Sequence, residues 1–476
     1  MSGLRVWSGH ILLTGVVGVA FVAAACGGDE VKPPVTPQKA AADAGPPPAP
    51  TADNTATVPV EHAEVVGNAK KDYDDGFKAW AAGDLVAAKK AFTSAVQDDS
   101  GSAPAHYALG AVIERLGNAN AAQQEYKAAF SAKSDFDAAI GAYALSLANN
   151  GRLGEADSFL TDRHQRAPMS APIETLLAEV KSLEKDSGTA QQLAQDALRL
   201  NPDYKPAMVT IARDHFRAGR GELARYALQA ILDGFGDSSP PRDKDNAEAH
   251  LLRGLIEKQA GQRAAALADF EAARANRPDM VDALIQVGVM KLEAGNVIQS
   301  LPLLEAAVRY APNAPLAHLN LGDAYRLGGR AADARKEFDT ALSLDSTLAV
   351  AHYDIGLLYL FSPRIPGTNA SDQVATAIKE LNTYKSMRGA RATAGDDIDE
   401  LLSRATAKQA ELKVVVPPPT PSPPPAAAPS GSAASAGSAP KPTASAPAAT
   451  TAAGTASAAS AAKPPASGIQ RADPYK

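Results

Sequence analysis

The chain has 476 residues, with 47 Lys and Arg against 53 Asp and Glu, a formal net charge of -6 and a single cysteine. The charge is about -8 over residues 61–416, and the last sixty residues carry four basic side chains and one acidic side chain. Neither part has the concentrated basic face that nucleic-acid binding requires. A single cysteine also excludes an internal disulfide, so the sequence does not describe a disulfide-stabilised scaffold.

The first 25 residues have the pattern of a secretory signal. Arg5 precedes an uncharged apolar run, Ile11 to Ala25, and small residues follow at its end. Fifteen residues make about 22 Å of helix, which is short of the roughly 30 Å hydrocarbon layer. The sequence therefore predicts a signal peptide over residues 1–25 in preference to a permanent membrane span.

The residues around Cys26 predict how the chain is held in the envelope. Ala23-Ala24-Ala25-Cys26 resembles the bacterial lipobox, although Ala23 stands where that motif usually has Leu. The resemblance implies that Cys26 receives diacylglycerol and becomes the mature N-terminus. Cleavage at the same alanines without lipidation, or an uncleaved anchor, are the alternatives. Gly27, where an aspartate would retain the protein at the inner membrane, favours the periplasmic side of the outer membrane.

Two segments are predicted to be disordered. Residues 26–60 and 417–476 are rich in Pro, Ala, Ser and Thr and have almost no large apolar residue. Such segments bury too little surface to offset the entropy of ordering the chain. The first would be a tether. The second is either a passive tail or an extension that reaches another envelope component, and its last residues, GIQRADPYK, could be a docking peptide.

The middle of the chain repeats with a period of 34 residues. One series of glycines comprises Gly83, Gly117 and Gly151, and then Gly261, Gly295 and Gly329. A second series in the same frame comprises Gly76 and Gly110, and then Gly254, Gly288, Gly322 and Gly356. Pro168 and Pro202, and later Pro278 and Pro312, keep the same spacing.

A 34-residue period with small residues at fixed places resembles the tetratricopeptide repeat (TPR). In the copy from Ala249 to Pro278, we expect Gly254 to let the first helix approach the second. Gly261 would end the first helix in a left-handed conformation, and Pro278 would stop the second. The resemblance implies an all-α superhelical solenoid of about nine helix-turn-helix repeats, starting near residues 69, 103, 137, 171, 205, 247, 281, 315 and 349.

The repeat array is predicted to span residues 61–395, with insertions near 234–246 and 362–372. The fourth repeat departs from the pattern because Lys185 replaces glycine, and the ninth is interrupted by its insertion. Residues 396–416 place Ile398, Leu401, Leu402, Ala405 and Leu412 along one helical stripe. We expect this segment to be the capping helix that covers the last apolar face of a solenoid.

The sequence offers no catalytic or metal site. His106, His250, His318 and His352 share one repeat position, and neighbouring copies of a solenoid do not bring such residues to one point, so we interpret them as structural. HExxH, GxSxG and Cys/His zinc spacings are absent, and Gly234-Phe235-Gly236 has no GK[ST] after it. We therefore expect neither an enzyme nor a cofactor.

Tetratricopeptide proteins usually hold partners along the face built from the first helix of each repeat. Transferred to this chain, the resemblance implies a partner-binding groove at Tyr73, Phe77, Trp80, Tyr107, Arg115, Arg213, Phe216, Arg217, Leu255, Val289, Arg326 and Tyr353. A mostly apolar face with a few arginines suits a helical or extended segment held by side-chain burial. The alternative is that several of these residues pack between repeats and meet no partner.

These expectations combine into one hypothesis for function. The chain would be a lipid-anchored periplasmic scaffold that gathers envelope proteins, and it resembles tetratricopeptide lipoproteins of gliding-motility and type IV pilus secretin assemblies. The alternative is an accessory regulator of a cell-wall synthesis or remodelling enzyme.

Overall fold

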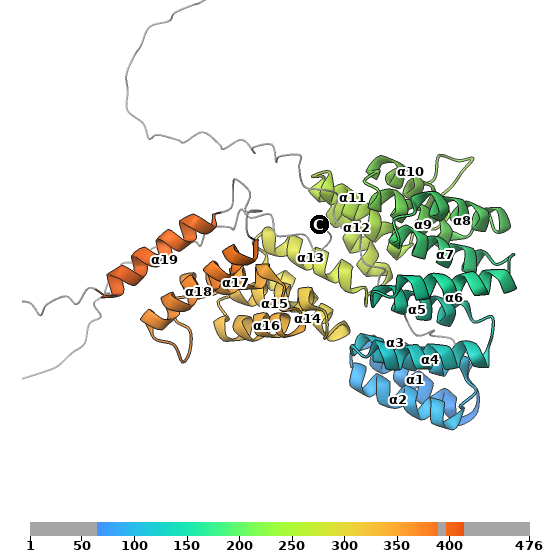
Figure 1. The fold of residues 1–476 in the computed structure, drawn as a ribbon, viewed down its shortest axis with the longest axis horizontal. Helices are drawn as coiled ribbons and strands as arrows, with labels where there is room; N and C mark the ends of the chain where they lie inside the picture. Colours follow the sequence, from blue (N-terminus) through green and yellow to red (C-terminus); the bar gives the residue numbers. More distant parts are fainter. Residues whose placement is uncertain (1–63, 389–396, 414–476) are drawn as a thin grey trace, which may run out of the picture. The chain divides into compact units, whose positions relative to one another are not determined.

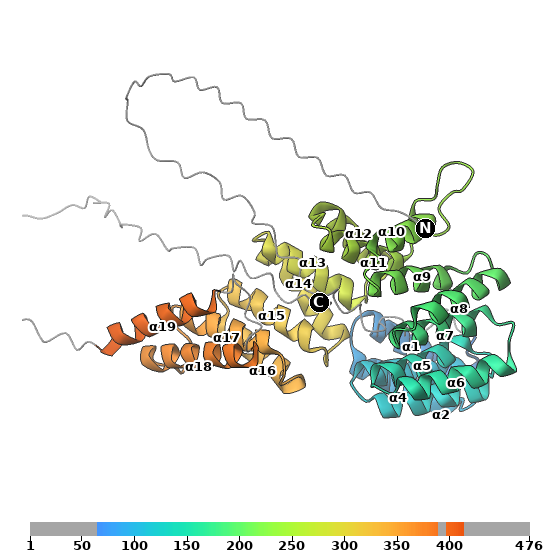
Figure 2. The ribbon, with the colours of Figure 1, turned by 45° about the horizontal axis from the view of Figure 1, so that its top comes forward.

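The computed structural model describes residues 64–388 and 397–413 (Figure 1). These residues form nineteen α-helices and contain no strand. Eighteen helices follow one another as nine antiparallel pairs, and α19 comes last. Figure 2 shows the same succession of pairs from a second direction. The predicted signal peptide, Cys26, the tether and the C-terminal tail lie outside the described residues.

The helix bounds follow in chain order. The pairs are α1 (Gly67–Ala81) with α2 (Leu85–Asp98), α3 (Ala103–Arg115) with α4 (Ala119–Ala132), α5 (Asp137–Asn149) with α6 (Leu153–Arg166), α7 (Ala171–Leu183) with α8 (Ser187–Leu200), α9 (Lys205–Arg217) with α10 (Gly221–Leu232), α11 (Ala247–Gln259) with α12 (Arg263–Asn276), α13 (Val281–Glu293) with α14 (Val297–Tyr310), α15 (Pro315–Leu327) with α16 (Ala331–Leu344), and α17 (Ala349–Phe361) with α18 (Ala370–Arg388); α19 is Ile398–Lys413. Eight of the nine first helices begin at the residue predicted from the repeat period, and α1 begins two residues earlier.

The small residue in the middle of each first helix allows close packing within the pair, as predicted. A Cβ atom built on Gly254 would lie 2.6 Å from the ring of Phe270, and one on Gly322 would lie 2.6 Å from the ring of Phe338. Real Cβ atoms do not approach other heavy atoms this closely. The two helices of these pairs can therefore pack at this distance only because the first helix lacks a side chain there.

The turn between paired helices uses a left-handed residue, also as predicted. Gly261 has φ +75° directly after α11. At the same repeat position Lys185 has φ +66°, the one non-glycine residue with positive φ among the described residues. The fourth repeat thus keeps the turn although it lacks the glycine. Such a conformation costs a lysine about 1 to 2 kcal/mol relative to glycine.

The segment after α10 is held by backbone hydrogen bonds within itself and to the end of α10. Phe235 donates its backbone N–H to Ser239 at 2.7 Å, and Asp243 donates to Ile231 at 2.9 Å. Arg242 reaches back to the carbonyl oxygen of Pro202 at 3.1 Å. This segment is therefore anchored at both ends and in its middle.

The last helix covers the end of the array. Ile398, Leu401 and Ala405 of α19 are buried, whereas Leu412 is 44% exposed, so the predicted apolar stripe does not extend to it. Tyr353 of α17 donates its hydroxyl to Asp397, just before α19, at 3.0 Å. Among the described residues, no helix is long and apolar enough to cross a membrane.

Candidate functional site

The twelve residues predicted to bind partners all lie on first helices of the pairs, namely α1, α3, α9, α11, α13, α15 and α17. We call this set the first-helix face. Eight of its members are buried: Tyr73, Trp80, Tyr107, Arg115, Phe216, Leu255, Val289 and Tyr353. The other four are partly exposed: Phe77, Arg213, Arg217 and Arg326. Their role in partner binding stays a prediction.

The tyrosines of this face pack mainly against second helices. The ring of Tyr73 stands edge-on to Phe92 of α2, with centroids 5.3 Å apart, and the Tyr353 ring lies 5.1 Å from Tyr384 of α18. Tyr107 lies 6.0 Å from Tyr126 of α4. Aromatic pairs at these distances contribute to the packing of the pair. These three rings therefore contribute to packing within their own helix pairs, and their role in partner binding stays a prediction.

A buried carboxylate joins the two arginines of α9 to the preceding repeat. Glu179 of α7 accepts from Arg213 at 2.9 Å and from Arg217 at 2.6 Å, and its side chain is 5% exposed. Burial would raise the pKa of Glu179, but the two guanidinium groups outweigh it and lower that pKa to about 2. Glu179 is therefore ionised at neutral pH and holds both arginines in place.

A second buried acid organises the turn beside this cluster. Asp214 of α9 accepts from Ser182 at 2.9 Å, from Ser187 at 2.6 Å and from Gln191 at 2.7 Å. Arg220 donates to the same carboxylate at 3.0 Å. Four donors satisfy this carboxylate, so it fixes the α7–α8 turn against α9 and has little capacity left to bind a ligand.

From Arg213 the charged groups continue across the next two repeats with alternating sign. Arg213 donates to Glu248 of α11 at 3.3 Å. Glu248 lies 3.6 Å from Arg277, and Arg277 lies 3.8 Å from Asp279, in the segment between α12 and α13. Asp279 in turn lies 3.7 Å from Arg115 of α3. The series thus links residues that are far apart in the sequence.

Near the end of the array Arg326 is held within its own helix. It donates to Asp323 three residues earlier at 2.9 Å. Burial lowers the pKa of Arg326, and the nearby carboxyl group of Asp354 on α17 opposes this change. Burial raises the pKa of Asp354 itself to about 7. A carboxyl group that titrates near neutrality makes this part of the array sensitive to pH.

The four histidines at the shared repeat position each tie a first helix to the second helix of its pair. His106, His250 and His318 place Nδ1 at 2.7, 2.7 and 2.6 Å from Glu125, Asp269 and Glu337. His352 lies 2.6 Å from Glu380 in the same way. Each histidine thus has a separate partner, which suits the structural interpretation.

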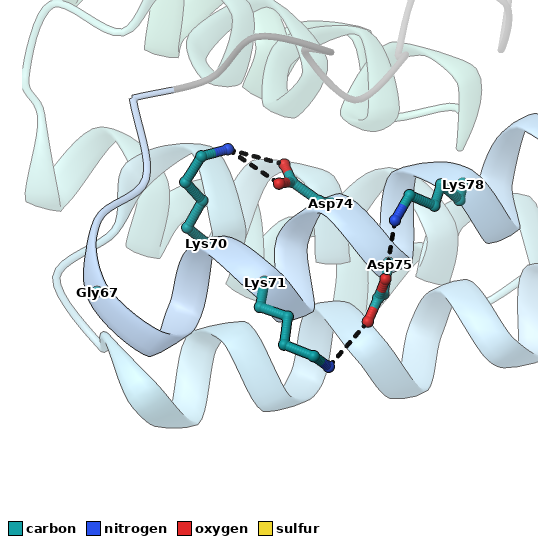
Figure 3. Close-up of a pocket in the computed structure, with 6 residues that line it drawn as sticks. All are labelled: Gly67, Lys70, Lys71, Asp74, Asp75 and Lys78. Carbon is teal, nitrogen blue, oxygen red and sulfur yellow. Dashed lines mark hydrogen bonds and ion pairs between the residues drawn. The ribbon is translucent and has the colours of Figure 1, made fainter.

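A hollow on the surface along α1 does not suit a small molecule. It is an open volume of about 320 Å³ along α1, lined by Gly67, Lys70, Lys71, Asp74, Asp75 and Lys78 (Figure 3). Lys70 pairs with Asp74 at 2.9 Å, and Asp75 pairs with Lys71 and Lys78 at 3.0 and 3.1 Å. Ligand pockets are usually enclosed and mostly apolar, so we interpret this hollow as a solvated charged surface. Within residues 64–388 and 397–413, no group of three or more His, Cys, Asp or Glu could hold a metal ion.

Sequence reasoning did not identify several residues of the charged series, namely Glu179, Asp214, Glu248, Arg277 and Asp279. One signal was present: Glu179 and Arg213 are 34 residues apart, so they occupy the same position in consecutive repeats and should be neighbours. No sequence signal pointed to the contact between Asp279 and Arg115, because it depends on how the repeats stack over a longer distance.

Comparison with known proteins agrees with the repeat geometry. The tetratricopeptide repeat family model matches residues 209–281 and 288–349. Among solved structures, the chain resembles the APC/C hetero-tetramer Cut9–Hcn1, with 16% identity and a TM-score of 0.49 over 68% of this chain and 59% of that chain. It also resembles MamA from Desulfovibrio magneticus RS-1, with 21% identity and a TM-score of 0.31 over 39% of this chain and 96% of that one.

A third similar structure is YrrB, described as a TPR protein with an unusual peptide-binding site. It shares 15% identity and a TM-score of 0.28, over 52% of this chain and 97% of its own. This chain thus spans 59% of the Cut9–Hcn1 chain and nearly all of the two smaller ones. The tetratricopeptide repeat model thus matches two stretches of the array, and the nine helix pairs give the described part of the chain an all-helical solenoid fold.

Proposed function

We propose that this protein is a membrane-anchored periplasmic scaffold, which binds segments of envelope proteins through the first-helix face. Tetratricopeptide repeats typically act as non-catalytic scaffolds for protein partners and bind them as peptides. The observation that carries the proposal is the repeat array itself. Nine helix pairs provide a long series of first helices along which a partner segment could bind.

The cellular location in this proposal comes from the sequence. The apolar run and the Ala-Ala-Ala-Cys26 motif support export and lipidation, and the Pro/Ala-rich segment after Cys26 supports a tether that holds the array away from the bilayer. Within the envelope, we assign the scaffold to an assembly of the gliding-motility or pilus secretin kind.

Crosslinking and affinity purification of the tagged full-length protein from its native envelope tests this proposal. The variants are Cys26→Ser, which removes the lipidated residue, and Phe77→Ala, which changes a partly exposed member of the first-helix face. Val86→Ala is the matched control, because Val86 lies on α2 of the same repeat and is 74% exposed. We expect Cys26→Ser to leave the membrane fraction and Phe77→Ala to lose partners, while Val86→Ala keeps them.

Each result has a defined meaning for the proposal. Motility or secretin components among the partners support the assembly we name, whereas peptidoglycan synthases or hydrolases would replace it with the regulator of a cell-wall enzyme. A Cys26→Ser protein that stays in the membrane with all its partners would contradict the lipid anchor. Recovery of the same partners by Phe77→Ala and wild type would contradict binding at this end of the face.

A further inference from the structure

The turn between α14 and α15 contacts the ends of α1 and α3, about 200 residues earlier in the chain. Tyr310 donates its hydroxyl to the carbonyl oxygen of Ala81 at 2.8 Å. Arg115 donates to the carbonyl oxygen of Tyr310 at 3.2 Å, and Asn313 donates to the carbonyl oxygen of Arg115 at 3.3 Å. We call these four residues together with Asp279 the latch. It joins the first two repeats to the seventh and eighth.

Glycines at two turns make room for these contacts. A Cβ atom on Gly117 would lie 2.8 Å from the side-chain nitrogen of Asn313. A Cβ atom on Gly83 would lie 3.4 Å from Cβ of Arg309, within contact distance. In the latch, the turns that contain Gly83 and Gly117 therefore pack against the end of α14 and the turn after it. The hydrogen bonds there are mostly accepted by backbone carbonyl oxygens.

The ion pairs of Asp279, one of which lies in the latch, are longer than the Glu179–Arg217 pair within the repeat stack. Arg115 and Asp279 lie 3.7 Å apart, and Arg277 and Asp279 lie 3.8 Å apart, whereas Glu179 and Arg217 lie 2.6 Å apart. Among the described residues, Nε and Nη2 of Arg277 and Oδ2 of Asp279 are buried without a hydrogen-bond partner. A buried polar atom without a partner costs free energy, so the charged side of the latch is held less firmly than the stack it joins.

The latch also occupies part of the predicted groove. Its Arg115 side chain is 3% exposed and lies over the ring of Trp80, with its guanidinium carbon 5.2 Å from the ring centroid. Trp80 itself is 2% exposed. Arg115, one of the twelve residues of the first-helix face, is therefore engaged by Tyr310 and Asp279 while the latch is closed, and a partner can reach its side chain only after the latch opens.

We propose that the latch is an autoinhibitory contact: it closes the array on itself and engages Arg115, and its opening frees this residue of the first-helix face for a partner. The part of this inference that concerns partners rests on the proposed function. The closed and open states themselves do not, and they can be measured without any partner.

A disulfide across the latch tests whether the closed state exists in solution. In full-length protein with Cys26→Ser, Gly83→Cys and Arg309→Cys would place two Cβ atoms about 3.4 Å apart, close to the roughly 3.5–4.5 Å found in disulfides. Lys185 shows that this repeat position accepts a side chain at positive φ. Gly151→Cys with Arg309→Cys is the matched control, because Gly151 has φ +76° and nothing within 4 Å. We expect rapid oxidation of the first pair only. Equal or absent crosslinking in the two pairs would overturn the proposal.

Hydrogen exchange measured by mass spectrometry tests whether the latch opens. Tyr310→Phe removes one hydrogen bond, which should raise the open fraction, and with it the exchange of the Ala79–Gly83 and Arg309–Asn313 segments, about fivefold. The oxidised Gly83→Cys/Arg309→Cys protein should show the slowest exchange there. Tyr126→Phe is the control, because the Tyr126 hydroxyl bonds to Glu114 within one repeat. If Tyr310→Phe leaves both segments unchanged, the latch does not open.

Incubation of the purified oxidised and reduced forms with solubilised native envelope, followed by crosslinking and purification, then tests the gate without requiring the lipid anchor. We expect the oxidised form to lose the partners that the reduced form recovers. Identical partners from both forms would overturn the gate, whereas partners from neither form would contradict the proposed function and leave the latch to be judged by exchange and crosslinking.

Discussion

At the scale of single residues, the middle of the first helix and the residue sixteen positions later are matched in size in six of the nine repeats, whereas in the seventh Gly288 faces Leu304. Glycine at the first position accompanies Phe92, Tyr126, Phe270 or Phe338 at the second. Where the first helix has Ala144 or Ala212 instead, the second helix has Leu160 or Leu228, both fully buried. The two positions therefore share one limited volume, which either a larger ring or a methyl group can occupy.

This matching of side-chain size between the two positions predicts the effect of Gly322→Ala. The added methyl group would lie 2.6 Å from the Phe338 ring, so we expect a loss of about 1–3 kcal/mol in the free energy of unfolding, measured by urea denaturation. The Gly322→Ala/Phe338→Leu variant should lose less than the sum of the two single variants, because it reproduces the pairing of Ala144 with Leu160.

Gly154→Ala is the control for helix propensity, since a Cβ atom at that position in α6 meets nothing within 4 Å. It should leave stability unchanged or raise it by up to about 1 kcal/mol. A Gly322→Ala protein as stable as wild type would show that the helices of this pair can move apart, contrary to the packing described here.

At the scale of secondary-structure elements, the bonds between histidines and carboxylates hold paired helices together. The hydrogen bond to Glu125 raises the pKa of His106. For His318, burial lowers the pKa, but the hydrogen bond to Glu337 outweighs it, so the pKa is again raised. A raised pKa in the folded protein means that protonation of these histidines favours folding.

The pH dependence of stability follows from this direction. The stabilisation is fully present below the unfolded pKa of about 6.5, and it is lost as pH rises through the higher pKa of the folded protein. We expect the free energy of unfolding to fall as pH rises above about 6.5, and to fall less in His106→Gln/His318→Gln. Urea denaturation at several pH values measures both. An equal decline in the double variant and wild type would assign the effect to other groups.

The sequence predicted the helix pairs well for a physical reason. Each repeat contains both helices and the turn between them, so the position of Gly254, Gly261 and Pro278 was enough to locate α11 and α12. The bonding of Glu179 to Arg213 depends only on the neighbouring repeat, and the spacing of 34 residues could have revealed it. The burial of Arg115 could not be predicted, because Asp279 and Tyr310, from distant parts of the array, contribute to it.

At the scale of the whole molecule, a solenoid exposes an apolar face at each end unless another element covers it. At the C-terminal end of the described array, α19 has this role, with Ile398, Leu401 and Ala405 buried. Truncation after Arg388 should therefore expose apolar surface on α17 and α18, lower the melting temperature and promote association, as measured by thermal denaturation and light scattering.

Truncation after Lys413 is the matched control, because it keeps α19 and removes only the residues that follow. This protein should melt as the full chain does. If both truncations behave alike, α19 does not stabilise the end of the array.

The latch also makes the expected order of folding differ from that of an ordinary repeat array. In an ordinary repeat array, stability is close to a sum of terms for single repeats and adjacent pairs, and folding spreads from one repeat to the next. Bonds from Ala81 and Arg115 to Tyr310 and Asn313 join residues about 200 positions apart. Closing so long a loop costs entropy that the intervening repeats must first reduce by folding. The first five repeats can therefore fold during synthesis before Tyr310 has been made, and closure of the array follows the folding of the repeats that lie between Arg115 and Tyr310.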